Sequence, residues 1–192
     1  MNKVTWMFVC LLSLASGCFA QLPTADAAGH RTNAQIIEFI VSDGEKLVMG
    51  VADAMPAEKY SFAPSAGEFK DVRSFAAQLK HIAADNYLLG AGILGEKPPA
   101  DTGKGENGSG AIQSKVEIVA YLKESFVYMH RAAASIDDAK VPIPTPKISP
   151  WPAGTATRLG LASEDCVHMY DHYGQLVEYL RMNGIIPPAS RK

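Results

Sequence analysis

Apolar residues recur every three or four positions along four segments of the chain, a spacing that places them on one face of an α-helix. The segments cover about residues 33–55, 71–94, 111–135 and 159–183. Capping residues mark several ends: Thr32 or Asn33 begins the first segment, Pro56 follows it, and Gly184 follows the last. No alternating strand pattern and no internal repeat is evident, so the pattern predicts an all-α protein.

Two long connections separate the later segments. Residues 95–110 are rich in glycine, proline and small polar residues, which predicts a mobile loop. Residues 137–155 carry five prolines and Trp151, which predicts a stiffer, extended segment. An extended chain gains about 3.3 Å per residue, so either connection can run the length of a helical bundle. We therefore expect a four-helix bundle with long loops after the second and third helices.

The first 20 residues have the pattern of an export signal. Lys3 precedes an apolar run at residues 6–14, and small residues precede a possible cleavage site before Gln21. The apolar run is short for a transmembrane helix. Residues 15–18 (ASGC) also resemble a lipobox, which would leave a lipid anchor on Cys18. We expect an exported protein, periplasmic or secreted, with simple secretion favoured over lipid anchoring. Residues 21–32 would form a flexible segment before a domain at 33–190.

Charge and cysteine content narrow the possible functions. Without the first 20 residues, whose only charged side chain is Lys3, the chain has 17 basic and 20 acidic side chains and a formal charge of −3. This balance does not favour binding to nucleic acid, and no basic amphipathic helix indicates a membrane surface. Cys166 alone remains beyond the signal, so we expect no internal disulfide and a domain stabilised by its core.

Three histidines are the main candidates for chemistry. His168 and His172 are four residues apart, so they lie one turn from each other on one helix face, and His81 falls in the second helical segment. Helical bundles build metal sites from inward side chains of facing helices, and three imidazoles leave coordination positions open for water or substrate. We hypothesise a divalent-metal site, with zinc as the default ion and nickel, iron or manganese also compatible. The alternative is a bundle in which these histidines never meet.

Several polar residues near these histidines could orient a ligand or transfer a proton. Asp165 precedes His168 by three residues, Gln175 follows it by seven, and Asp85 follows His81 by four. Two of them have an alternative interpretation. Asp165, together with its neighbour Glu164, suits the favourable end of a helix beginning near residue 163, and Asp85 suits a solvated surface position.

The remaining histidines and the cysteine are weaker candidates. Cys166 lies roughly 200° around the helix from His168, so we interpret it as a small buried side chain. His130, at the end of the third segment, is a reserve ligand, and His30 lies in the flexible segment. Met169 stands where zincin proteases carry glutamate after the first histidine, which argues against that peptidase chemistry.

Three segments resemble the DinB-like superfamily of small bacterial metalloproteins. Residues 55–64 (MPAEKYSFAP) are similar to its "LP-x-E-x-Y-x-x-x-P" passage, and residues 75–83 (FAAQLKHIA) to its "L-x-H-L-A" segment. Residues 168–175 and 179–188 resemble its closing "H-x-x-H-H-x-G-Q … YLR-x-x-G-x-x-PP" pattern. Where many relatives have adjacent histidines, this chain has Asp171 before His172.

The resemblance implies an up-down-down-up four-helix bundle whose metal ligands are His81, His168 and His172. Members of the family include thiol-dependent transferases or isomerases, proteins described as hydrolases, and many without a known reaction. Because low-molecular-weight thiol cofactors are mainly cytosolic, the export signal favours a metal-dependent hydrolase that acts on a small molecule, with Asp165 assisting and the loop around Trp151 shaping a pocket. The alternatives are a metal-dependent thiol S-transferase and a non-catalytic metal- or ligand-binding envelope protein. Oligomeric state is not readable.

Overall fold

A computed structural model describes residues 29–192, and this part of the chain forms a bundle of four α-helices without strands. The helices are α1 (Asn33–Ala54), α2 (Phe75–Leu94), α3 (Lys115–Ala134) and α4 (Arg158–Met182). Two short 3-10 helices, η1 (Ala57–Lys59) and η2 (Pro188–Ser190), follow α1 and α4. The prediction of an all-α four-helix bundle is confirmed. The expected export signal and most of the expected flexible segment lie outside the described residues.

Serine and threonine side chains determine where the helices begin. The Thr32 and Ser114 side chains accept hydrogen bonds from the third amides of α1 and α3 in capping boxes, and Ser74 caps α2 in the same way without the box. The expected starts of α2 and α3 at about residues 71 and 111 were therefore four residues too early. Asp71, with φ of 63°, adopts a left-handed conformation that a helix cannot include.

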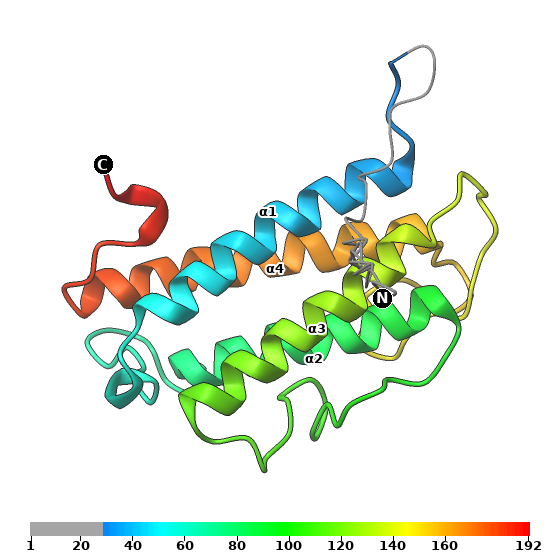
Figure 1. Cartoon of the computed structure of the whole chain (residues 1–192). Coiled ribbons are helices and arrows are strands. Elements are labelled where there is room, and N and C mark those ends of the chain that lie inside the picture. Colours follow the sequence, from blue (N-terminus) through cyan, green and yellow to red (C-terminus); the bar gives the residue numbers. More distant parts are fainter. Residues whose placement is uncertain (1–28) are drawn as a thin grey trace, which may run out of the picture.

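The four helices form two layers, with α1 beside α4 and α2 beside α3 (Figure 1). Helices α1 and α4 run in one direction and α2 and α3 in the other, which is the up-down-down-up arrangement. Contacts also join α2 to α4 and α1 to α3, so α1 and α2 are diagonal partners. Because α2 and α3 are parallel, the connection at residues 95–114 must run back along the whole bundle, and its length allows it.

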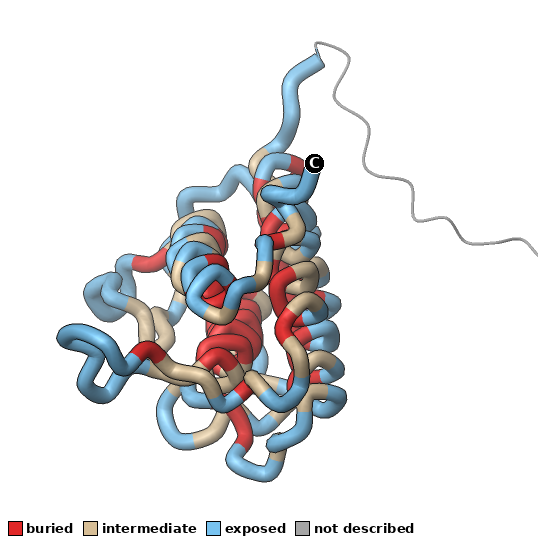
Figure 2. The backbone as a smooth tube through the Cα atoms, turned by 90° about the vertical axis from the view of Figure 1, so that its left-hand side faces the viewer, coloured by how far each residue is buried: buried red, intermediate tan, exposed pale blue. Residues whose placement is uncertain are grey.

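The buried side of each helix faces the centre of the bundle (Figure 2). Small residues let the two helices of each layer approach closely. A Cβ atom at Gly90 would lie 2.9 Å from the Tyr128 ring, and one at Gly44 would overlap the Met169 side chain. The largest fully buried side chains are apolar and come from all four helices or their ends, among them Met55, Phe75, Leu79, Leu122, Phe126, Met129 and Leu161.

The connection between α2 and α3 is attached to the bundle along its length. The Lys80 ammonium donates hydrogen bonds to the carbonyls of Ser109 and Ile112, and the Tyr121 hydroxyl donates to the carbonyl of Asp101. Its glycine- and proline-rich composition led us to expect a mobile loop, and the structure adds that α2 and α3 donate hydrogen bonds to three of its carbonyls. As a consequence, the loop can contribute fixed groups to a site on α2.

Among residues 29–192, no helix combines the length and apolar character that crossing a membrane requires.

Candidate metal centre

The side chains of His81, His168 and His172 converge between α2 and α4. The Nε2 atom of His168 lies 2.9 Å from Nε2 of His81 and 2.9 Å from Nε2 of His172. One ligand nitrogen from each ring lies within 4.8 Å of the other two. His81 and His172 are buried and His168 is partly exposed, so the cluster reaches solvent on one side. The fold brings the three histidines together, as the sequence predicted.

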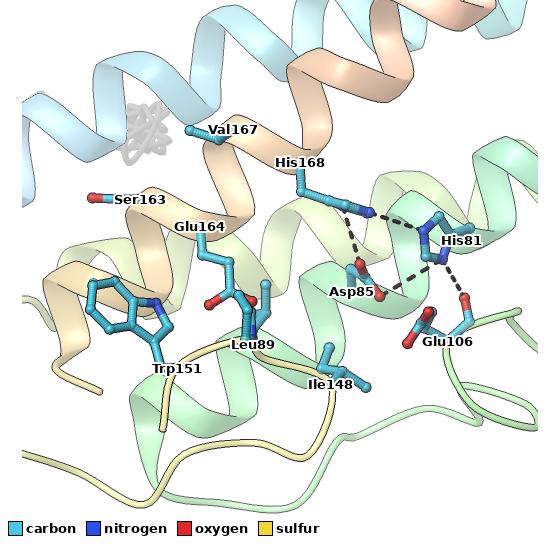
Figure 3. A pocket seen from close by; sticks show the side chains of 12 residues that line it. His81, Asp85, Leu89, Glu106, Ile148, Trp151, Ser163, Glu164, Val167 and His168 are labelled. Atoms are coloured by element: carbon cyan, nitrogen blue, oxygen red, sulfur yellow. Dashed lines mark hydrogen bonds and ion pairs between the residues drawn. The ribbon is translucent and has the colours of Figure 1, made fainter. Parts of the chain in front are cut away.

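In His81 and His168, the Nδ1 atom contacts an oxygen acceptor, and this contact fixes the tautomer of the ring. Nδ1 of His81 lies 2.7 Å from the carbonyl oxygen of Glu106, in the loop after α2. A carbonyl can only accept, so Nδ1 of His81 carries the proton and Nε2 keeps its lone pair. Nδ1 of His168 lies 3.1 Å from Oδ2 of Asp85, which favours the same tautomer (Figure 3). Both Nε2 lone pairs therefore point into the cluster.

The surroundings keep these rings neutral. Burial, followed by the charges of the neighbouring histidines, lowers the pKa of His168 to about 3. Burial and then His81 lower the pKa of His172 to about 4, and burial also lowers the pKa of His81. Lone pairs that face each other at 2.9 Å repel unless a proton or a cation lies between them, and the low pKa values disfavour the proton. The donor set thus fits a divalent ion that prefers imidazole.

Asp85 is part of this site and is not the solvated charge that its position suggested. Its side chain is buried, with Oδ2 against His168 and Oδ1 3.9 Å from Nδ1 of His81. Oδ1 has no hydrogen-bond partner within residues 29–192. Burial, and then the charges of Glu106 and Asp165, raise the pKa of Asp85 to about 8. The residue is therefore a carboxyl group that can exchange a proton near neutral pH.

Asp165 lies apart from the histidines. With the Asn86 amide nitrogen turned toward α4, Asn86 donates to Oδ1 of Asp165 at 3.2 Å and faces the Ser125 hydroxyl at 3.0 Å. Burial raises the pKa of Asp165 to about 7. Because α4 begins at Arg158, Asp165 also lies beyond the first turn, so the expected helix-end position was wrong. Its contacts make Asp165 a link between α2 and α4.

Gln175 makes its hydrogen bonds to side chains other than the three histidines. Its amide oxygen accepts from Nε2 of Gln78 at 2.6 Å, and its amide nitrogen donates to Asp171 at 2.8 Å. The bond to Gln78 connects α4 to α2 one turn beyond the histidines, and the bond to Asp171 lies within α4. The proposed contact between Gln175 and a ligand imidazole is therefore not present.

The weaker candidates also lie away from the cluster. His130 lies between two carboxylates of α1, with Nδ1 2.8 Å from Glu38 and Nε2 2.9 Å from Glu45. It is not a ligand of this site and instead joins α3 to α1. Cys166 is buried, and burial raises the pKa of its thiol to about 12, in agreement with a packing role. His30 is exposed before α1.

A cavity of 610 Å³ lies beside the histidines and is lined by His81, His168 and Asp85. The loop before α4 forms one wall, with Ile148 and Trp151, as expected for the segment that carries Trp151 (Figure 3). His172 does not line this cavity, so His81 and His168 present the accessible side of the cluster. A small molecule in the cavity therefore has access to both rings.

Sequence reasoning missed two groups of this site. The Glu106 carbonyl is a backbone atom from a distant loop, and nothing in the residue type indicates its role. Glu164 was interpreted only as a favourable charge at a helix end, but it lines the cavity. Its place two turns into α4, on the side of the loop with Trp151, could be recognised only after the helix start was known.

Fold and site together define a class of protein: a four-helix bundle in which one histidine of α2 and two of α4 can hold a metal ion. The family model of the DinB superfamily matches residues 42–176, which include all three histidines. The match covers more than half of the chain, and the chain belongs to the DinB superfamily. The closing segment at residues 179–188 lies beyond the matched region. A comparison with curated proteins found no significant match.

Proposed function

We propose that this protein is a metal-dependent hydrolase that acts on a small molecule outside the cytoplasm, with zinc as the default ion. His81, His168 and His172 would hold the ion. The observation that carries the proposal is the convergence of three Nε2 atoms while two Nδ1 atoms contact fixed acceptors, Asp85 and the Glu106 carbonyl.

A divalent ion held by these residues would act as a Lewis acid, which would polarise a substrate carbonyl and lower the pKa of a water molecule. The chain's own residues support that chemistry. Asp85 holds His168 in the required tautomer, and its second oxygen, Oδ1, is free to take or give a proton. Leu89, Ile148 and Trp151 give the cavity apolar walls.

The proposed location depends on the first 20 residues, whose charge, apolar run and small-residue end have the pattern of an export signal. Cleavage before Gln21 and a lipid on Cys18 give different N-termini. Mass spectrometry of the protein from the periplasm or medium would distinguish them. Protein recovered only from the cytoplasm, with Met1 retained, would contradict the proposed location.

The first test is metal content by mass spectrometry on protein purified without a polyhistidine tag. We expect close to one equivalent of metal in the natural protein, loss of the metal in His168→Ala, and retention in His130→Ala, a histidine variant away from the site. Metal-free protein that stays folded and takes up no zinc, nickel, iron or manganese on titration would refute the metal site.

The second test is turnover by the metal-loaded protein on a panel of small esters, amides and lactones. We expect hydrolysis that disappears in His168→Ala and persists in His130→Ala. The panel also includes low-molecular-weight thiols with an electrophile, the reaction expected of a thiol S-transferase. Thiol conjugation without hydrolysis would contradict the hydrolase proposal, and tight metal binding without any turnover would favour a binding protein.

A further inference from the structure

The cavity beside the histidines has an apolar body. Leu89 of α2, Val167 of α4 and the loop residues Ile148 and Trp151 line it. Its volume of 610 Å³ is in the range of pockets that enclose a small organic ligand. Hydrocarbon or aromatic groups would lose contact with water on entering, which favours a ligand with an apolar part.

The titratable groups that face the cavity are all acidic apart from the two histidines. Asp85, Glu106 and Glu164 line it, and no lysine or arginine is among its lining residues in the described part of the chain. Glu106 is 3.8 Å from the guanidinium of Arg73, which partly compensates its charge. Glu164 accepts a hydrogen bond of 2.7 Å from the Ser149 hydroxyl, and no ion pair joins it to a basic side chain within residues 29–192.

Trp151 lies on the same wall as Glu164. The six-membered ring of Trp151 is 3.5 Å from the position that a Cβ atom of Gly160 would occupy, and Gly160 is one helical turn before Glu164. Ser149 links the two residues, because its hydroxyl donates to Glu164 and accepts from the backbone amide of Trp151, and Figure 3 shows both side chains among those that line the cavity. A carboxylate next to an aromatic face suits an ammonium group, which gains a charge-assisted hydrogen bond and a cation–π contact.

Asp85 gives an independent indication that the cavity suits a ligand with a hydrogen-bond donor. The residue is 6 % exposed and lines the cavity, and its Oδ1 atom has no partner within the described residues. Buried carboxylate oxygens are normally hydrogen-bonded, so an unpartnered one beside a cavity indicates a missing donor. This oxygen therefore adds an acceptor to the cavity lining, which favours a cationic ligand over an anionic one.

We infer that the cavity binds a small apolar amine, with its hydrocarbon body between Leu89 and Trp151 and its protonated nitrogen at Glu164. The inference rests on the proposed function only for the reaction that follows binding, since the bound ligand would lie beside His81 and His168. It also distinguishes this cavity from one built for acidic thiols, because such thiols carry carboxylates that would meet Asp85 and Glu164 without a lysine or arginine to pair with.

The test is calorimetric titration of the zinc-loaded protein with phenethylamine and with 2-phenylethanol, which has the same shape and no charge. We expect phenethylamine to bind with about a tenfold lower Kd, the effect of one charge-assisted hydrogen bond. Glu164→Gln should remove that preference and leave 2-phenylethanol binding unchanged. Trp151→Leu should weaken both ligands. Glu178→Gln, at the far end of α4 and paired with Arg181, is the matched control and should behave as the natural protein.

Three results would overturn the inference: equal Kd values for the amine and the alcohol, no measurable binding of the amine at millimolar concentration, or a preference that survives in folded Glu164→Gln. Circular dichroism establishes that each variant is folded. Measurements on the natural protein separate this inference from the proposed function. A preference for the amine in natural protein that takes up no metal and shows no hydrolysis would refute the hydrolase and keep the amine site. Metal binding and hydrolysis without a preference for the amine would refute the amine site and keep the hydrolase.

Discussion

Replacing Asp85 with asparagine should change metal affinity and the stability of the metal-free protein in opposite directions. Asp85 contacts Nδ1 of His168 at 3.1 Å and is buried without a second hydrogen-bond partner at Oδ1. With an ion bound, the carboxylate strengthens the ligand. Without one, the same buried carboxylate is a cost to the fold.

The effect on stability follows from the raised pKa of about 8, against an ordinary value of 3.8. Between these values the folded protein binds more protons than the unfolded chain, so the free energy of unfolding falls as the pH rises from about 4 to about 8. The full shift corresponds to roughly 6 kcal/mol, and relaxation of the site reduces it. We expect metal-free Asp85→Asn to gain about 2 kcal/mol at pH 8.5, or roughly 4–8 °C in Tm, and little at pH 4.5.

The effect on the metal has the opposite sign. Removing the hydrogen-bonding partner of a ligand histidine typically costs about 10–100-fold in metal affinity. Asparagine can still accept the Nδ1 proton of His168, so we expect a loss near the lower end, about tenfold, in a chelator competition with zinc. Asp85→Ala, which lacks an acceptor, should lose more.

Asp165→Asn is the matched control. Asp165 is another buried carboxyl group with a raised pKa of about 7, and it contacts Asn86 in place of a histidine. The substitution Asp165→Asn should therefore stabilise the metal-free protein at pH 8.5 and leave zinc affinity unchanged. The reasoning fails if metal-free Asp85→Asn melts below the natural protein at pH 8.5, or if Asp165→Asn weakens zinc as much as Asp85→Asn does.

Three further predictions test other parts of the structure. Burial lowers the pKa of His130, but its bonds to Glu45 and Glu38 outweigh burial and raise the pKa above 6.5. The stabilisation of the folded protein by protonated His130 is therefore complete below about pH 6.5, and it disappears as the pH rises through the raised pKa. Denaturant unfolding of His130→Gln should therefore show a deficit of about 1 kcal/mol at pH 5.5 that shrinks at pH 9, and a constant deficit would contradict it. Gly92→Ala would place a Cβ atom 2.6 Å from the Pro146 ring, so thermal melts should show a loss of about 1–3 kcal/mol, and an unchanged Tm would contradict the packing. Gln175→Ala should cost about 1 kcal/mol through its lost bonds and leave zinc affinity unchanged; a weaker zinc site would restore Gln175 as a partner of the ligands.

Local patterns in the sequence were enough for the helices and for the three histidines. Helical spacing and caps depend on neighbours within one turn, so each segment could be located within a few residues. His168 and His172 share a helix face for the same local reason. The motifs around His81 and His168 added the family resemblance, which the match over residues 42–176 bears out.

The roles of the polar neighbours could not be read in this way. Asp85, Asp165 and Gln175 all have helical spacings that place them near a ligand histidine, yet only Asp85 contacts one. The difference arises from how α2 and α4 are rotated and crossed, which turns Asp165 toward Asn86 and Gln175 toward Gln78. A helical wheel describes one helix, and it contains no information about the facing one.

By itself, the sequence determined four amphipathic helices, their order and the type of donor that could bind a metal. Only the tertiary structure decided that a carboxylate and a loop carbonyl hold two of the rings, and that acidic and aromatic side chains face the cavity beside them. The physical reason is range: helix formation and side-chain periodicity act over about four residues, whereas these contacts join groups that are distant in the chain and meet only once the core has packed.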